Sequence, residues 1–323
     1  MKATAKAHPI EGLVKYHGMR DEQLRQPYHD SVSVCTAPSH TKTTIEFEPD
    51  SNDDVFLIDG EEVEGRSRER IESVVDHVRD LADIDHAVRF ESENDFPTNI
   101  GFGSSSSGFA AAARALVGAT DLDMTLPDIS TVARRGSASA ARAVTGAFSH
   151  LRTGKNDADC RSERIETELE EGLRIVGAEV PSYKETEEAH REAADSHMFE
   201  ARMAHIHGQI DEMRDALLAG DFHRTFELAE HDSLSLAAAT MTGPAGWVYW
   251  QPRTIEVFNT VRELREADIP AYFSVDTGAS AYINTTTDHV DRVEGAIADC
   301  GVDTRVWEVG GPSRLLDEGD ALF

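Results

Sequence analysis

Lysine is scarce in this sequence. Only six of the 323 residues are lysines, and the other 25 of the 31 basic residues are arginines. Acidic residues number 60 and are spread along the whole chain, so the formal net charge is −29. An acidic surface of this kind excludes a nucleic-acid-binding protein, because such proteins place basic side chains against phosphates.

The excess of negative charge also predicts the salt concentration in which the protein is stable. In ordinary salt a charge of −29 repels itself and opposes the compact state. Concentrated salt removes this cost, because the Debye length falls to about 3 Å at 1 M. We therefore expect a halophilic protein, as in an archaeal cytoplasm. The alternative is an ordinary acidic protein with a well-solvated surface.

Cysteine and long apolar runs are also in short supply. The three cysteines, Cys35, Cys160 and Cys300, lie far apart and form no CxxC pair, which argues against a disulfide framework or a zinc site. No apolar run approaches the roughly 20 residues of a membrane span, and the opening MKATAKAHPI lacks the apolar core of a signal peptide. With 40% hydrophobic residues the chain can still build a core. We expect a cytoplasmic protein that binds no membrane.

Residue patterns predict a mixture of strands and helices. Strands are expected at 43–47, 55–58, 87–91, 270–276 and 305–309, where β-branched and aromatic residues cluster near turn formers. Helices are expected at 68–81, 109–117, 129–143, within 182–219, and at 222–239 and 254–267. These elements predict an α+β fold with two domains, residues 1–180 and 181–323.

The most specific local feature is a Gly- and Ser-rich turn that enters an Ala-rich helix. In NDFPTNIGFGSSSSG, Gly101 and Gly103 permit backbone conformations that other residues avoid. Ser104, Ser105 and Ser106 add hydroxyls at a helix N-terminus, where unpaired N–H groups and the helix dipole favour an anion. The segment predicts a nucleotide-phosphate site, although it lacks the Gly-Lys-Ser/Thr of a Walker loop. A flexible linker is the alternative.

This segment resembles a known phosphate loop. Pro97, Gly101, Gly103, Ser104 and Ser105 match the P-x-x-x-G-L-G-S-S pattern of the GHMP kinases, with Phe102 in place of Leu. The resemblance implies that Pro97, Gly101, Gly103 and Ser104 to Ser106 bind ATP.

Four further segments, in order along the chain, narrow the match. KYHGMRD from Lys15, continuing to DSVS, resembles the KYWGKRD…P…DSLS opening of the mevalonate diphosphate decarboxylase family. FPT, SASAAR ending at Arg142, and FSVDTG around Asp276 resemble its FPT, SGSACR and F-x-x-D-A-G. The family fold pairs an N-terminal α/β domain with a C-terminal ferredoxin-like α+β domain, and its active site lies in the cleft between them. Members are often homodimers.

The resemblance also implies roles for single residues. In that family ATP, with Mg²⁺, phosphorylates the 3-hydroxyl of a mevalonate derivative, and the new phosphate leaves as CO₂ is lost. Asp276 would orient and deprotonate the hydroxyl, Lys15 would neutralise the transferred phosphate, and Arg142 would clamp the substrate carboxylate. By position alone, Asp276 is one of 60 acidic residues and could simply cap a turn. Substrate contacts are expected from the side chains of Tyr16, Ser137, Ser139 and Lys184. Mg²⁺ would be held mainly by phosphates and water, and no protein ligand is assigned.

The opening departs from the family at two positions. His17 replaces a Trp, and Met19 replaces a Lys that helps to bind the terminal phosphates of the 5-diphosphate. Loss of that cation favours 5-phosphomevalonate as substrate and isopentenyl phosphate as product, as in the haloarchaeal phosphomevalonate decarboxylase branch. Lys184 or Arg20 could instead compensate for Met19.

Three other functions remain open at this point. The first is a diphosphomevalonate decarboxylase that makes isopentenyl diphosphate. The second is a 3-hydroxyl kinase without decarboxylation, and the third is a non-catalytic, ligand-binding regulator on the same fold. The partners implied are ATP and a phosphorylated mevalonate.

Overall fold

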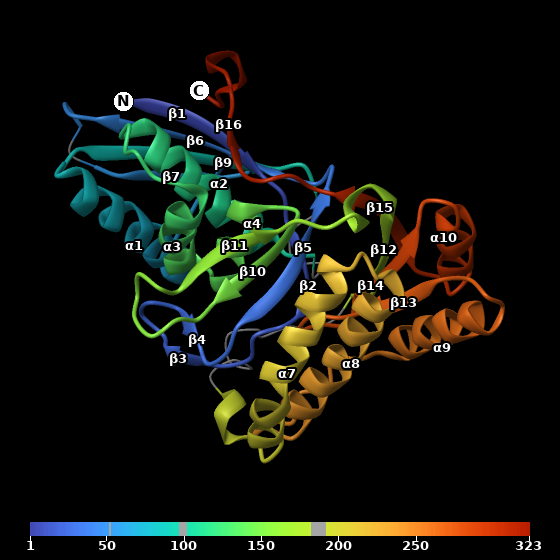
Figure 1. The fold of residues 1–323 in the computed structure, drawn as a ribbon. Helices are drawn as coiled ribbons and strands as arrows, with labels where there is room; N and C mark the ends of the chain where they lie inside the picture. The colour runs from blue at the N-terminus through green and yellow to red at the C-terminus, as the bar shows by residue number, and fades with distance from the viewer. Residues whose placement is uncertain (52, 97–101, 182–191) are drawn as a thin grey trace.

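A computed structural model describes residues 1–51, 53–96, 102–181 and 192–323 (Figure 1). Within these residues the chain forms a six-stranded sheet, an eight-stranded sheet and one small hairpin. Helices pack on both larger sheets, which agrees with the predicted α+β class.

The six-stranded sheet is built from strands at the two ends of the chain. In sheet order its strands are β16 (Arg314–Leu315), β1 (Lys2–Ala7), β6 (Thr41–Glu48), β9 (Ala87–Asn94), β7 (Val55–Ile58) and β8 (Glu61–Glu62). The helices that share its core are α1 (Gly65–Ala82), α2 (Ser104–Ala119), α3 (Leu126–Gly136) and α4 (Ala138–Thr145). Because β1 pairs with β16, the N and C termini lie side by side (Figure 1).

The eight-stranded sheet runs through both halves of the chain. Its order is β11 (Arg161–Ile165), β10 (Phe148–Arg152), β5 (Ser31–Ala37), β15 (Asp303–Val309), β12 (Leu173–Glu179), β14 (Ala281–Thr286) and β13 (Ala271–Ser274), and β2 (Ile10–Val14) also pairs with β5. The remaining short elements are β3 (Met19–Asp21), β4 (Gln26–Pro27), α5 (Leu169–Gly172), and the 3₁₀ turns η1 (Ala193–Asp195) and η2 (Glu318–Asp320).

The C-terminal half has ferredoxin-like connectivity. Helices α7 (Phe199–Leu218), α8 (Phe222–Met241) and α9 (Pro252–Glu266) separate β12 from β13, and α10 (Val290–Ala298) separates β14 from β15. The resulting β–α–β–β–α–β order, with the strands arranged β15–β12–β14–β13, confirms the predicted fold of this half. The boundary at residue 180 stays a prediction.

The elements expected from the sequence are confirmed at β6, β7, β9, β13, β15, α1, α2, α8 and α9, with ends that differ by a few residues. One expectation was wrong. The helix expected over 129–143 is two helices, because Ser137 is extended at φ −158° and ψ 127°. The Gly136 carbonyl oxygen accepts hydrogen bonds from the Arg70 side chain in place of a hydrogen bond within a continued helix. Of the helical segment expected over 182–219, residues 182–191 lie outside the described residues.

Excess negative charge lies on solvent-facing positions. On α7, Glu200, Asp211, Glu212 and Asp215 are exposed, whereas Ile206 and Ile210 are buried in the core. The described part of the chain contains no helix that is long and apolar enough to span a bilayer.

This distribution predicts a salt-dependent stability. Transfer from molar KCl to dilute buffer is expected to lower the unfolding temperature, because unscreened repulsion among exposed carboxylates opposes folding. In a chain of this size, each kcal/mol lost lowers Tm by about 2 °C. Thermal unfolding followed by circular dichroism measures the effect. Sucrose at matched osmolality is the control: it stabilises by exclusion from the protein surface but screens no charge, so it is expected to raise Tm less than KCl does. A constant Tm across the salt range would refute the halophile interpretation.

Candidate active site

Strand β2 is the element around which the candidate site is built. All five of its residues are buried, and α8 packs on it from one side. Gly12 makes room for two side chains: a methyl group at this position would lie 2.7 Å from Lys15 Cγ and 2.8 Å from Asp276 Oδ1. Lys15 and Asp276 therefore meet over Gly12, although they are far apart in sequence.

Lys15 is held by side chains from the C-terminal half. Its Nζ atom donates to Ser233 Oγ and to Ser274 Oγ, at 3.0 Å each, and lies 3.8 Å from Asp232 Oδ2. The residue is only 5% exposed. Burial lowers the pKa of Lys15, and the nearby carboxylates of Asp232 and Asp276 oppose that shift. The ammonium group is thus held by these contacts, within the electrostatic reach of Asp276.

A buried ion pair between Arg202 and Asp232 holds the backbone of Lys15. Asp232 Oδ2 accepts the backbone N–H of Lys15 at 2.9 Å, and Asp232 Oδ1 accepts from Arg202 at 2.8 Å. Arg202 also donates to the Lys15 carbonyl at 2.6 Å. Both side chains are almost fully buried, where an unpaired charge would be strongly destabilising. The pair fixes the turn that carries Lys15.

Arg142, Tyr16 and Ser139 form a second group. The Arg142 guanidinium lies 5.6 Å from the centre of the Tyr16 ring and 3.5 Å from Ser139 Oγ, which is itself 3.3 Å from the Tyr16 hydroxyl. Burial lowers the pKa of Arg142, while Tyr16 and Asp276 favour its charged form. Within the described part of the chain, Arg142 Nε has no hydrogen-bond partner. Ser137 lies at the N-cap of α4, two residues before Ser139. This arrangement leaves a buried guanidinium available for an anion.

The predicted phosphate-binding helix is attached to the same strand. Gly103 is the N-cap of α2 at φ +75°, and a methyl group there would lie 3.0 Å from the Ile10 carbonyl oxygen. Ser106 Oγ accepts the Ile10 N–H at 3.2 Å and donates to the Gly103 carbonyl at 2.6 Å, so this hydroxyl is used inside the protein. Ser104 is half-buried and Ser105 is exposed, so both can meet a ligand. Pro97, Gly101 and Lys184 lie outside the described residues.

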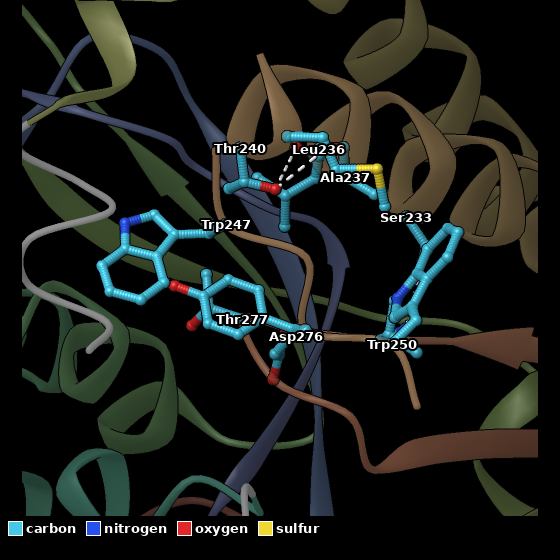
Figure 2. A pocket seen from close by; sticks show the side chains of 11 residues that line it. Ser233, Leu236, Ala237, Thr240, Trp247, Trp250, Asp276 and Thr277 are labelled. Atoms are coloured by element: carbon cyan, nitrogen blue, oxygen red, sulfur yellow. Dashed lines mark hydrogen bonds between the residues drawn. The ribbon is translucent and has the colours of Figure 1, made fainter. Parts of the chain in front are cut away.

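An aromatic pocket adjoins Asp276. Figure 2 shows Asp276 and Thr277 facing α8 residues across a space that Trp247 and Trp250 flank. Two of the three tryptophans of the chain therefore line one pocket. This pocket was not predicted from the sequence, although the two tryptophans close together at 247 and 250 were an available signal. The arrangement offers an apolar wall beside a carboxylate.

The sequence also did not predict four residues that contact Lys15, namely Asp232, Arg202, Ser233 and Ser274. No spacing in the sequence relates them to Lys15, because each contact joins residues that are 187 or more positions apart. His205 and His207 on α7 are exposed, and the three cysteines are buried and form no disulfide.

Comparisons with known proteins define the class. Residues 7–162 match the diphosphomevalonate decarboxylase-like N-terminal domain, and residues 175–308 match the mevalonate 5-diphosphate decarboxylase C-terminal domain. The crystal structure of mevalonate diphosphate decarboxylase from Staphylococcus aureus superposes with a TM-score of 0.93 at 27% identity, covering 98% of each chain. A related structure, described as a complex with MVAPP, AMPPCP and magnesium, has a TM-score of 0.91 at 25% identity and covers 98% of this chain and 99% of that one.

The fold is therefore that of the GHMP kinases, as the resemblance implied. Phosphomevalonate decarboxylase from Haloferax volcanii is 76% identical over the full length of both chains. The chain belongs to the mevalonate diphosphate decarboxylase family.

Proposed function

We propose that the protein decarboxylates 5-phosphomevalonate in an ATP-dependent reaction that yields isopentenyl phosphate, ADP, phosphate and CO₂. The observation that carries this proposal is the meeting of Asp276 and Lys15 over Gly12. The relative from Haloferax volcanii, which carries the name phosphomevalonate decarboxylase, supports the same reaction.

The proposed first step is phosphoryl transfer. Asp276 orients the 3-hydroxyl and takes its proton as the hydroxyl oxygen attacks the γ-phosphorus of ATP. Lys15 lies beside Asp276 and offsets the negative charge of the transferred group. Hydrogen bonds to Ser233 and Ser274 hold the Lys15 ammonium group in this position.

The second step breaks a C–O and a C–C bond. The 3-phosphate leaves with the C–O electron pair, and the electrons of the carboxylate C–C bond form the alkene as CO₂ departs. Arg142 provides a planar guanidinium for a two-point contact with the carboxylate before it leaves. The apolar pocket of Trp247 and Trp250 fits the methyl-bearing carbon skeleton.

ATP is proposed to bind at the N-terminus of α2, through Ser104, Ser105 and the backbone N–H groups there. Mg²⁺ would come with the nucleotide and help to neutralise its phosphates. In the part of the chain that the structure describes, no group of three or more His, Cys, Asp or Glu residues is placed to hold a metal ion. Mg²⁺ usually keeps several waters, so phosphates and water would supply most of its ligands.

The surroundings of Met19 support a monophosphate substrate. Met19 packs against the apolar cluster that contains Tyr16 and Ala138, so the side chain at this position supplies no positive charge. Arg20, one possible replacement, donates to the carbonyls of Thr153 and Gly154 at 2.7 and 2.9 Å. Its charge is therefore directed toward the backbone rather than toward Tyr16.

Product identification tests the proposed function. The protein is incubated with ATP, Mg²⁺ and either 5-phosphomevalonate or the 5-diphosphate in concentrated KCl, and products are identified by mass spectrometry. Isopentenyl phosphate with CO₂ supports the proposal. A 3-phosphorylated product without CO₂ would indicate a kinase, and binding without turnover would indicate a regulator.

Substitution of Met19 by Lys is expected to shift this preference. A charge-assisted contact contributes about 1.5–3 kcal/mol, so kcat/KM for the diphosphate relative to the monophosphate is expected to rise about 10- to 100-fold. Steady-state kinetics with both substrates measures the ratio. Leu218→Lys adds the same charge at an exposed site on α7 and is expected to leave the ratio unchanged. An unchanged ratio in Met19→Lys would contradict the assigned role of this position.

A cytoplasmic location and a homodimer stay predictions. Size-exclusion chromatography with light scattering in molar KCl measures the oligomeric state.

A further inference from the structure

Glu11 is a buried carboxyl group that the proposed mechanism leaves unused. It lies on β2 beside Gly12 and is 0% exposed. Its Oε1 atom accepts one hydrogen bond, from Asn284 Nδ2 on β14 at 2.7 Å. Among the described residues, its Oε2 atom has no partner. A carboxylate with a single amide donor is poorly solvated, so this environment favours the protonated acid.

The charges near Glu11 balance one another when the Glu11 carboxyl group is neutral. Lys15, which follows β2, is positive, and Asp276, after β13, is negative, and these are the charged groups that act on Glu11. Their two charges cancel when Glu11 carries none, and Arg202 and Asp232 form an ion pair of their own next to Lys15. An ionised Glu11 would add a negative charge beside Lys15 and Asp276.

The other neighbours of Glu11 offer little compensation. Ser274 on β13 donates its hydroxyl to the Gly12 carbonyl at 2.9 Å, and Tyr282 on β14 directs its hydroxyl to the Ile10 carbonyl. On β5 the residue opposite Glu11 is Val34, which is apolar. Burial raises the pKa of Glu11 from 4.5 to about 8, and the charge of Asp276 adds to that shift. The hydrogen bond from Asn284, the charge of Lys15 and the nearby Ser274 hydroxyl only partly oppose it.

We propose that Glu11 is a positioning residue that works as a neutral carboxylic acid, preserving the positive charge of Lys15 for the transferred phosphate. When Glu11 ionises, it attracts the Lys15 ammonium group and repels the incoming phosphate. The charge that assists transfer is then partly cancelled. This inference rests on the proposed function for its catalytic consequence, but the protonation of Glu11 can be tested without substrate.

The substrate-free test compares the stability of the wild-type protein and Glu11→Gln as pH changes. Gln mimics the neutral acid and can accept the same bond from Asn284. Between pH 4.5 and about 8 the folded protein keeps the Glu11 proton that the unfolded chain releases, so wild-type stability falls as pH rises through this window. Glu11→Gln has no proton to release at this position, so its stability does not fall for this reason. Its unfolding temperature relative to wild type is expected to rise across the window and to level off above it.

Glu62→Gln on β8 is the matched control, because this carboxylate is exposed. Its stability difference from wild type is expected to stay flat with pH. A flat difference in Glu11→Gln as well would overturn the protonation claim, whatever reaction the protein catalyses.

The catalytic test is the alkaline limb of kcat/KM. Wild-type kcat/KM is expected to fall by up to about tenfold from its plateau by pH 9, because pH 9 is about one unit above the Glu11 pKa of about 8 and most of Glu11 is then ionised. In Glu11→Gln this fall is expected to be absent or to move to higher pH. If Lys15 losing its own proton set the limb, removal of a neighbouring negative charge would move it to lower pH. A downward shift or an unchanged limb would overturn the proposal, while failure of both substrates in the wild-type protein would count against the proposed function alone.

Discussion

Replacement of Asp276 by Asn is expected to lower kcat by about 10²- to 10⁴-fold, the usual contribution of a positioned general base. Asn keeps the shape of the side chain and loses the group that accepts the hydroxyl proton. Asp276 lies against Gly12 at the edge of the aromatic pocket, so the substitution leaves the strand packing intact. Rapid-quench assays of ADP and CO₂ measure the loss.

Binding separates a chemical role from a structural one. Trp247 and Trp250 line the same pocket as Asp276, so their fluorescence can report ligand binding in the variant. ATP affinity is expected to remain close to that of the wild-type protein, because α2 is unchanged. Asp288→Asn, in the exposed turn after β14, is the control and is expected to retain full turnover. Full activity in Asp276→Asn would refute the assignment of the base.

The sequence was sufficient to predict the fold because its local patterns and its family motifs agree. The β-branched runs at 43–47 and 55–58 are in β6 and β7, and the Ala-rich segment at 109–117 is in α2. Gly136, directly before Ser137, was the available local signal for this boundary, but one glycine costs a helix only about 1 kcal/mol and does not by itself end it. The boundary depends on Arg70, from α1, which binds the Gly136 carbonyl.

The candidate site was predictable only in part. The family motif identified Lys15, which the structure places at 5% exposure. Its partners could not be predicted, since Ser233 and Ser274 are 218 and 259 positions away. Glu11 was one acidic residue among 60, and only its pairing with Asn284, 273 positions away, distinguishes it. Motifs identify residues that act on the substrate, whereas the residues that support them depend on three-dimensional contacts.

Replacement of Lys15 by Met is expected to lower kcat by about 10²- to 10³-fold, as for the loss of one donor that stabilises charge in a transition state. The fold is expected to persist. Ser233 and Ser274 keep their bonds to the carbonyls of Ala229 and Gly12, and Asp232 still accepts from the backbone N–H of residue 15. Thermal unfolding checks this, and single-turnover kinetics measures the chemical step.

Lys42→Met on β6 is the matched control, because it removes a half-buried lysine from the sheet that lies away from Asp276. Its turnover is expected to match that of the wild-type protein. A second variant, Lys15→Ala, leaves space for an added ammonium ion, so ethylammonium is expected to restore part of its activity. If Lys15→Met lost no more activity than Lys42→Met, the charge of Lys15 would not assist phosphoryl transfer. The balance of charge between Lys15 and Glu11 would then have no catalytic consequence either, because that balance acts only through the Lys15 ammonium group.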